Sequence, residues 1–244
     1  LMDRGGIAHI LRSSVIHRLF VANTLLAKLR KVYKRNADAD VIHVNWLQNV
    51  LPLWGIPKPA VISVLGSDYG LLRLPFMVTL LRKVISQRRC ILAPNADWMV
   101  EGLKKHFGDI AEIATVPFGV KEMWFDINRN SKSLQTRRKW IAVSRVTKKK
   151  IGHLFFWGEN VFGEENELHL FGPMQEQIKI PQWVKYHGPA NPAQLHTQWF
   201  PEAAGLITLS QHDEGRPQVM LEAMAAKLPI IASDIPAHRN MIEH

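Results

Sequence analysis

The sequence has little cysteine: Cys90 is the only one among 244 residues. A single cysteine excludes an internal disulfide framework and is compatible with a reducing compartment. The sequence also lacks an uninterrupted apolar stretch of the roughly 20 residues that a membrane-spanning helix needs, and no segment resembles a secretory leader. We therefore expect a soluble, cytoplasmic protein.

Clustered metal ligands are lacking too. The eleven histidines are scattered, and the run His212-Asp213-Glu214 is one short loop without a second pair of ligands. We find no phosphate-binding Walker loop, no serine nucleophile elbow and no recognised nucleic-acid-binding motif. We therefore expect no metal site, no cofactor and no nucleic acid partner.

The chain does contain enough apolar residues for two cores. Its hydrophobic content is 47%, and its length allows two domains of ordinary size. The net charge of +10 is uneven, because residues 1–135 carry 19 Lys and Arg against 10 Asp and Glu. The basic first half includes an amphipathic helix expected within Ile7–Arg35, and it would attract an anionic membrane surface or a phosphorylated acceptor. The alternative is ordinary surface charge that keeps the protein soluble.

The most informative stretch covers residues 205–234. Two short apolar runs, Gly205–Ser210 and Pro229–Ser233, are typical of buried strands. Between them lie a polar loop and a run of good helix formers that begins around Pro217, a residue favoured in the first turn of a helix. The pattern predicts a strand, a loop, a helix and a second strand.

Two glutamates in this unit are candidate ligand-binding residues. Glu214 lies in the loop beside the helix amino terminus, where backbone N–H groups and the helix dipole favour an anion such as phosphate. Glu222 lies within the helix, and at about 100° per residue it points away from Met220 and Met224, which we expect to face the sheet. A ligand with its charged group at the loop and a polyhydroxyl part along the helix would contact both carboxylates. Nucleotide sugars have that shape.

This stretch resembles the donor site of the retaining glycosyltransferases of family 4, the glycosyl transferases group 1, which have the two-domain GT-B fold. The resemblance rests on E-G-R-P-Q-V-M-L-E-A-M-A at Glu214–Ala225 and L-P-I-I-A-S-D at Leu228–Asp234. Two positions depart from the family pattern. Arg216 stands where an aromatic residue is usual, and Lys227 stands where a glycine is usual.

The resemblance implies an α/β fold with two doubly wound, Rossmann-like domains. The first would face the acceptor and the second would bind the sugar donor. We predict that residues 1–135 form the first domain with its linker and residues 136–244 the second. The resemblance also implies that both domains are incomplete at the chain ends, so that the chain is an internal fragment of a longer enzyme.

Two cations follow the first predicted strand of the second domain, Trp140–Ser144. Arg145 carries a planar fork of N–H groups that can bind phosphate oxygens, and Lys150 adds a mobile charge as the next helix begins. They resemble the Arg and Lys pair that holds the donor diphosphate in the family. The alternative is a solvated basic turn.

Further site residues follow from the resemblance. Glu214, Arg145 and Lys150 would act in catalysis. The residues implied in binding the nucleotide sugar are Glu222, Gly215, Arg216, Pro217, Gly66, Ser67, His187 and Gly188. Among these, Gly66 would let the backbone approach the ligand closely, and the backbone around His187 and Gly188 would contact the nucleobase.

The resulting functional hypothesis is a glycosyltransferase. It would move a sugar from a nucleotide-diphosphate sugar to a glycan or lipid-linked acceptor with retention of configuration, without a metal or other cofactor. Two alternatives stay open: a non-hydrolysing nucleotide-sugar epimerase of similar fold, and a homologue that only binds. A peripheral position at the inner face of the membrane would follow if the basic half meets anionic lipid.

Overall fold

The computed structural model describes residues 15–36, 38–129 and 138–242. The chain forms two compact α/β units. Pro117 ends the first unit, and Phe118 begins the second, which continues to Ile242 apart from the loop residues Asp213–Arg216. Each unit is built on a parallel sheet, as the alternation of apolar runs and helical patterns predicts.

The first unit has a four-stranded sheet in the order β1-β2-β3-β4, with all pairs parallel. The strands are β1 (Ile42–Asn45), β2 (Ala60–Val64), β3 (Cys90–Pro94) and β4 (Glu112–Ile113). The helical segments are α2 (Val15–Arg35), η1 (Leu47–Leu53), η2 (Tyr69–Arg73), α3 (Met77–Ile85), η3 (Asp97–Met99) and α4 (Val100–Phe107). The helix expected within Ile7–Arg35 is thus observed over Val15–Arg35, and residues 7–14 lie outside the described residues.

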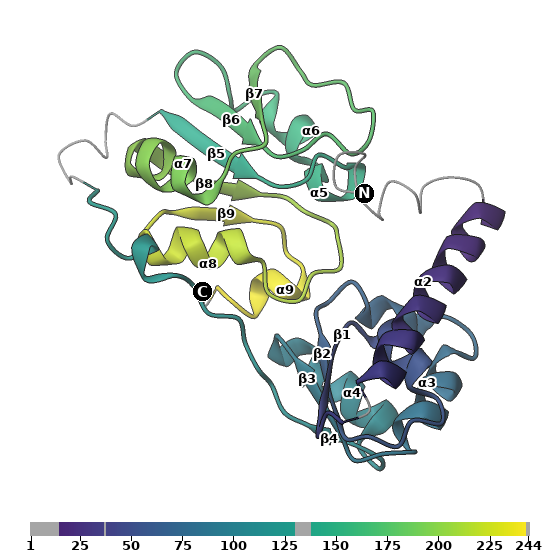
Figure 1. Cartoon of the computed structure of the whole chain (residues 1–244). Coiled ribbons are helices and arrows are strands. Elements are labelled where there is room, and N and C mark those ends of the chain that lie inside the picture. The colour runs from purple at the N-terminus through teal and green to yellow at the C-terminus, as the bar shows by residue number, and fades with distance from the viewer. Residues whose placement is uncertain (1–14, 37, 130–137, 243–244) are drawn as a thin grey trace. The chain divides into compact units, whose positions relative to one another are not determined.

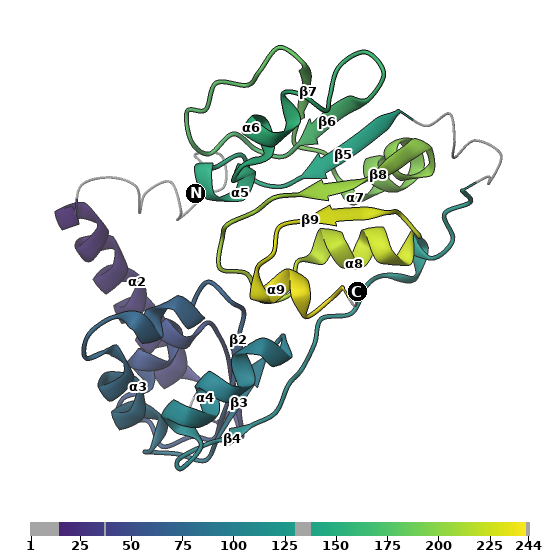
Figure 2. The same ribbon diagram turned by 180° about the vertical axis from the view of Figure 1, so that it is seen from behind.

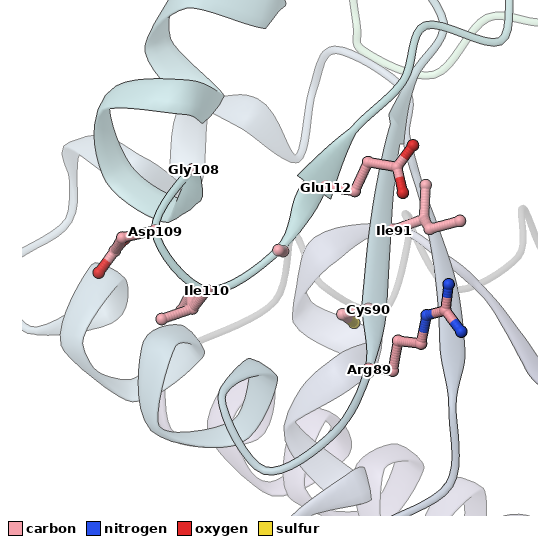
Figure 3. Close-up of a pocket in the computed structure, with 8 residues that line it drawn as sticks. Arg89, Cys90, Ile91, Gly108, Asp109, Ile110 and Glu112 are labelled. Atoms are coloured by element: carbon pink, nitrogen blue, oxygen red, sulfur yellow. The ribbon is translucent and has the colours of Figure 1, made fainter.

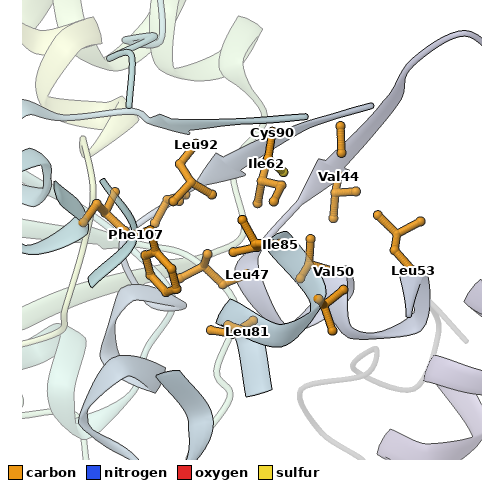
Figure 4. Close-up of a cluster of buried hydrophobic side chains, with 14 of the residues drawn as sticks. Val44, Leu47, Val50, Leu53, Ile62, Leu81, Ile85, Cys90, Leu92 and Phe107 are labelled. Carbon is orange, nitrogen blue, oxygen red and sulfur yellow. The ribbon is translucent and has the colours of Figure 1, made fainter. Parts of the chain in front are cut away.

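Alternate side chains of these strands enter one core (Figure 4). Val44 and Ile62 are buried on this face, together with Leu81 and Ile85 of α3. On the opposite face of β1, His43 and Asn45 are exposed. A histidine inside an apolar strand is more often a buried core group, but His43 lies at the surface, where its Nε2 is 2.8 Å from the hydroxyl oxygen of Ser63.

A buried arginine, Arg88, hydrogen-bonds to backbone carbonyls at the border of this core. The Arg88 guanidinium donates to the carbonyl oxygens of Leu53 (2.9 Å), Ile56 (2.7 Å) and Val84 (3.1 Å). These carbonyls belong to the ends of η1 and α3 and to the segment before β2, so a single side chain ties three parts of the unit together. Burial lowers the pKa of Arg88, but its usual value is so high that it stays charged.

The second unit has a five-stranded parallel sheet in the order β7-β6-β5-β8-β9. The strands are β5 (Lys139–Val143), β6 (Glu167–Phe171), β7 (Val184–Gly188), β8 (Ala203–Thr208) and β9 (Ile230–Ala232). The helical segments are η4 (Glu122–Trp124), α5 (Lys148–Ile151), α6 (Leu154–Gly158), α7 (Pro192–Gln194), η6 (Leu195–Trp199), η7 (Phe200–Glu202), α8 (Gln218–Ala225) and α9 (Pro236–Arg239). The strand order reverses between β5 and β8, and such switch points are where open parallel sheets bind ligands.

Helices cover both faces of this sheet, as Figures 1 and 2 show from opposite sides. On one face Ile141 and Leu206 pack with Phe200 and with Met220 of α8. On the other face Ala142 and Leu168 pack with Leu154 of α6. The second unit is therefore doubly wound, as predicted.

The segment that follows Pro117 belongs structurally to the second unit. Trp124 is 1% exposed and lies in the same core as Phe200, with 4.7 Å between the ring centroids. We predicted the boundary at residue 135, because the apolar pattern fades there. The division in the structure comes earlier because a large aromatic ring anchors the incoming segment. Most of the predicted connector, residues 130–137, lies outside the described residues.

Several element bounds differ from the sequence prediction. The strands predicted at Gly205–Ser210, Pro229–Ser233 and Trp140–Ser144 are observed as β8, β9 and β5, each with bounds shifted by one or two residues. Met224 was predicted to face the sheet with Met220, and this is wrong: Met220 is buried and Met224 is 45% exposed. Ala223, Ala225 and Ala226 around it are buried in the core of the second unit, so the packed face of α8 is offset from Met224. Among the described residues, no helix combines the length and the hydropathy needed to cross a membrane.

Candidate functional site

The carboxyl ends of the strands in the second unit carry several of the predicted site residues. Arg145 comes two residues after the end of β5, and it is exposed. Gly188 ends β7, and Glu214 lies in the loop that follows β8. Because the sheet is entirely parallel, these strand ends share one edge.

Local hydrogen bonds order the turn that carries the two cations. Thr147 is the N-cap of α5, and its hydroxyl accepts from the backbone N–H of Lys150 at 3.2 Å. Lys150 is half-buried in this helical turn, whereas Lys148 and Lys149 are exposed, as expected for surface charge. The hydrogen bond to Thr147 fixes the backbone of Lys150 in this turn, whereas Lys148 and Lys149 are exposed to solvent.

The loop after β8 is attached to the same turn. The backbone N–H of Gln211 donates to the carbonyl oxygen of Lys149 at 2.8 Å. This bond joins the start of the loop that carries Glu214 to the helix that carries Lys150, across the point where the strand order reverses. Gly215 and Arg216 follow in the same loop, and Pro217 is the N-cap residue of α8 rather than a residue of its first turn.

Glu222 lies on α8 and is half-buried. Burial raises the pKa of Glu222 to about 7, although a side-chain hydrogen bond with Gln218 and the charge of Lys121 act in the opposite direction. The carboxylate is therefore close to half ionised at neutral pH. Sequence reasoning missed Lys121, which lies far from Glu222 in the chain and carries no motif of its own.

His187 lies at the end of β7, and its ring is exposed. Its Nε2 is 2.9 Å from Nδ1 of His169, a buried histidine of β6 that sequence reasoning did not single out. Gly188 has a φ of +72°, a conformation that favours glycine. The two residues predicted near the nucleobase thus form a well-defined corner of the sheet edge.

Gly66 and Ser67 lie in the first unit, in the loop after β2. Gly66 has a φ of +104°, which explains why a glycine is needed there. Asp68, which sequence reasoning missed, fixes this loop: its carboxylate accepts from the backbone N–H groups of Leu47 (2.9 Å) and Leu65 (2.8 Å). Burial raises the pKa of Asp68, and these hydrogen bonds oppose the shift.

A pocket of about 350 Å³ is present in the first unit (Figure 3). Its lining includes Arg89 and Cys90 at the start of β3 and Glu112 at the start of β4. It therefore lies at the amino ends of these strands, away from the loops that follow their carboxyl ends, and none of the predicted site residues lines it. Burial raises the pKa of the Cys90 thiol to about 11, so this thiol is not a reactive thiolate at neutral pH.

A family model matches the part of the chain that carries several of these residues. Residues 139–244 match the family model of glycosyl transferases group 1. The matched segment contains Arg145, Lys150, His187, Glu214 and Glu222. No curated protein sequence matches the chain.

Solved structures resemble a larger part of the chain. HepE from Anabaena, in complex with UDP and glucose, has a TM-score of 0.64 and 13% identity, covering 88% of this chain and 65% of its own. Sucrose-phosphate synthase from Thermosynechococcus elongatus has a TM-score of 0.67 and 15% identity, covering 86% of this chain and 60% of its own. A UDP-forming α,α-trehalose-phosphate synthase from Burkholderia xenovorans has a TM-score of 0.62 and 12% identity, covering 91% of this chain and 65% of its own.

These likenesses confirm the predicted fold class, an α/β fold of GT-B type with parallel sheets. The chain spans 60–65% of the length of these three structures. At identities of 12–15% the comparison concerns the fold, and the function must be argued from the site.

Proposed function

We propose that this chain is part of a glycosyltransferase that takes a sugar from a nucleotide-diphosphate sugar and transfers it to an acceptor with retention of configuration. The observation that carries the proposal is the pair Arg145 and Lys150 at the carboxyl edge of the second sheet, beside its switch point and within the segment that matches the family model. Two cations at such an edge suit a diphosphate, whose oxygens accept charge-assisted hydrogen bonds.

The sugar-facing part of the proposal rests on the two glutamates. Glu222 would accept hydrogen bonds from ribose hydroxyls, because a carboxylate offers two acceptor oxygens to two adjacent hydroxyl groups. Glu214 would orient the transferred sugar through its hydroxyls. The first turn of α8 would add backbone N–H groups that have no partner within the helix.

Leaving-group stabilisation would supply most of the catalysis. Negative charge develops on the departing diphosphate, and Arg145, Lys150 and the amino end of α8 would all stabilise it. Within residues 15–36, 38–129 and 138–242, no three His, Cys, Asp or Glu side chains are grouped so that they could hold a metal ion. We propose that the reaction needs neither a metal nor another cofactor.

Support for the identity of the nucleotide comes from the solved structures. HepE was crystallised with UDP and with UDP-glucose. A UDP-sugar is therefore the first donor to test. We further propose a glycan or lipid-linked acceptor, as in polysaccharide biosynthesis, and a cytoplasmic location with peripheral membrane contact through the basic first half.

The decisive experiment measures binding before activity. Calorimetry with UDP, GDP and ADP, and with the matching nucleosides, should show a nucleoside diphosphate binding far more tightly than its nucleoside. If no diphosphate binds, the proposal is wrong. In the full-length enzyme, turnover of a nucleotide sugar without any acceptor would instead favour the epimerase, and binding without turnover would favour the binding-only homologue.

A further inference from the structure

Four polar side chains form a continuous hydrogen-bonded chain across β6 and β7. The ammonium of Lys185 donates to Oε1 of Glu167, and Oε2 of Glu167 lies 2.9 Å from Nε2 of His169. Nδ1 of His169 lies 2.9 Å from Nε2 of His187. We call these residues the histidine relay. It begins with a lysine at the surface, continues through the buried His169 and ends at the exposed His187.

A β-bulge places the last member of the relay at the sheet edge. The register pairs Leu170 with Tyr186 but Phe171 with Gly188, so His187 is an extra residue without a direct partner. Bulges re-aim side chains and are frequent beside active sites. The ring of His187 is thereby set at the end of β7, at the carboxyl edge of the sheet that also carries Arg145.

Aromatic rings hold the His187 imidazole in position. The centroid of Phe171 lies 4.7 Å from it with only 12° between the ring planes, and the centroid of Trp199 also lies 4.7 Å away. Both rings are themselves packed together at 4.8 Å. His187 therefore has a fixed orientation although it is exposed.

The relay determines which nitrogen of each ring carries the proton. Hydrogen bonds from Lys185 and His169 lower the pKa of Glu167 to about 2, so its carboxylate can only accept. Nε2 of His169 must then carry the hydrogen, and in the neutral ring its Nδ1 is an acceptor. Nε2 of His187 must in turn donate to that nitrogen, which leaves Nδ1 of the neutral His187 as an acceptor. In the described part of the chain this Nδ1 has no hydrogen-bond partner.

Burial and the neighbouring lysines favour the neutral form of both rings. Burial is the main cause that lowers the pKa of His169, with Glu167 opposing and Lys185 and Lys139 reinforcing the shift. Burial, His169 and Lys185 all lower the pKa of His187.

The neighbouring helical segment η6 places no charged side chain against the histidine relay. From η6 the residue that faces the relay is the uncharged Trp199. His196, on the same helical segment, instead pairs with the carbonyl oxygen of Met123 at 2.8 Å.

We propose that the relay fixes His187 as a hydrogen-bond acceptor that reads an N–H group on the nucleobase of the bound nucleotide. This inference rests on the proposed function, because that function places a nucleotide at this edge. Lys185, Glu167 and His169 are positioning residues: they act on the ligand through His187. Every common nucleobase carries a ring N–H or an amino group that could donate to Nδ1.

Protonation inverts this recognition. A proton taken up at His169 makes its Nδ1 a donor, so Nε2 of His187 must become the acceptor and the hydrogen moves to Nδ1. The nucleobase N–H then faces the N–H on Nδ1 of His187, and two donors cannot form a hydrogen bond. Binding of the nucleobase should therefore weaken as the pH falls through the pKa of His169.

The first test observes the rings directly by NMR. Two-bond ¹H–¹⁵N correlation spectra of the ligand-free protein at neutral pH should show hydrogen on Nε2 in both His169 and His187. Glu167→Gln should move the hydrogen of both rings to Nδ1, because the amide has one acceptor oxygen, which Lys185 occupies, and presents its N–H₂ to His169. The matched control Lys185→Met breaks the same ion pair but keeps the carboxylate, so the parent tautomers should persist.

The second test uses ligands. Of UDP, GDP and ADP, the tightest binder is compared with its analogue methylated on the base N–H: 3-methyluridine, 1-methylguanosine or N6,N6-dimethyladenosine diphosphate. Methylation should weaken binding to the parent by about 3- to 10-fold, the loss of one hydrogen bond. It should make no difference to His187→Ala or to Glu167→Gln.

Three results would overturn the inference. Hydrogen on Nδ1 of His187 in the parent at neutral pH contradicts the relay, and so does a Lys185→Met variant that behaves as Glu167→Gln does. Equal binding of the methylated and unmethylated nucleotides to the parent contradicts the reading of the base, while leaving the proposed function intact. If none of the three diphosphates binds, the proposed function and the assignment of a nucleobase to His187 are both wrong. The NMR spectra then show by themselves whether the relay fixes the tautomers of the two histidines.

Discussion

The backbone N–H of Leu228 donates to the carbonyl oxygen of Ala223 at 2.9 Å, closing the carboxyl end of α8. Inside this bond, the N–H of Lys227 donates to Met224 at 3.0 Å. The pair of bonds is a Schellman motif, which requires a left-handed residue after the C-cap. That residue is Lys227, with a φ of +57°. At the position where the family usually has glycine, the backbone therefore adopts the left-handed conformation that favours glycine.

We expect Lys227→Gly to stabilise the second unit by about 0.5–1 kcal/mol. A left-handed residue with a Cβ costs about 1–2 kcal/mol, and the greater freedom of glycine in the unfolded chain offsets part of the gain. Denaturant unfolding measures the change. Lys227→Ala is the control, since alanine keeps the Cβ and should bring no comparable gain. A destabilised Lys227→Gly variant would contradict this explanation.

Arg88→Ala should destabilise the first unit by about 2–4 kcal/mol. It leaves three carbonyl oxygens without the charge-assisted hydrogen bonds that Arg88 supplies. The adjacent Arg89 is exposed, so Arg89→Ala provides a matched control with the same loss of charge. Thermal unfolding should separate the two variants clearly, and equal melting temperatures would show that the buried bonds contribute little.

Arg145→Ala and Lys150→Ala should each weaken binding of a nucleoside diphosphate by about 1.5–3 kcal/mol. Binding of the corresponding nucleoside should change little, because the lost contacts are to phosphate. Lys149→Ala removes the same charge from an exposed neighbour and should have a small effect. Calorimetry that finds parent affinity in both site variants would remove these residues from the donor site.

Glu222→Gln should make the second unit more stable than the parent at neutral pH. The folded-state pKa of about 7 lies above the ordinary value of 4.5, so unfolding releases a proton between these values. The parent therefore loses stability as the pH rises from about 4.5 to about 7, whereas the amide does not titrate. Unfolding curves across this range should show the difference between variant and parent growing with pH, and a constant difference would contradict the raised pKa.

Glu222→Gln should also weaken the nucleotide through its ribose. An amide has one acceptor oxygen where the carboxylate has two, so the ribo form should lose more affinity than a 2′,3′-dideoxy nucleotide. In the parent, ribonucleotide binding should strengthen as the pH rises through about 7, because the ionised carboxylate is the better acceptor. An equal loss for both nucleotides would place the ribose elsewhere.

In the full-length enzyme, Glu214→Gln should slow turnover strongly without trapping a covalent sugar adduct. The proposed catalytic residues Glu214, Arg145 and Lys150 include a single carboxylate rather than the facing pair that glycosidases use, so a phosphate oxygen of the leaving group would take the acceptor proton. EDTA should have little effect on the rate. Mass spectrometry that finds a glycosylated peptide, or activity that depends entirely on a divalent cation, would overturn this mechanism.

The sequence by itself determined the strands and the turns that follow them. Apolar runs such as Gly205–Ser210 and Trp140–Ser144 are local patterns, and such a run needs no distant partner to be recognised as a strand. The departure at Lys227 is likewise read from the sequence, whereas its left-handed backbone conformation was found only in the structure. These features depend on near neighbours in the chain.

The tertiary structure decided which side chains meet. His169 and Glu167 look like ordinary members of a strand, and only the pairing of β6 with β7 brings them into line with Lys185 and His187. The charge of Lys121 acts on Glu222 across the fold, and Trp124 of the same segment packs in the core of the second unit. Such contacts join residues far apart in the chain, and strand register and packing fix them. Local propensity and periodicity therefore contain no record of them.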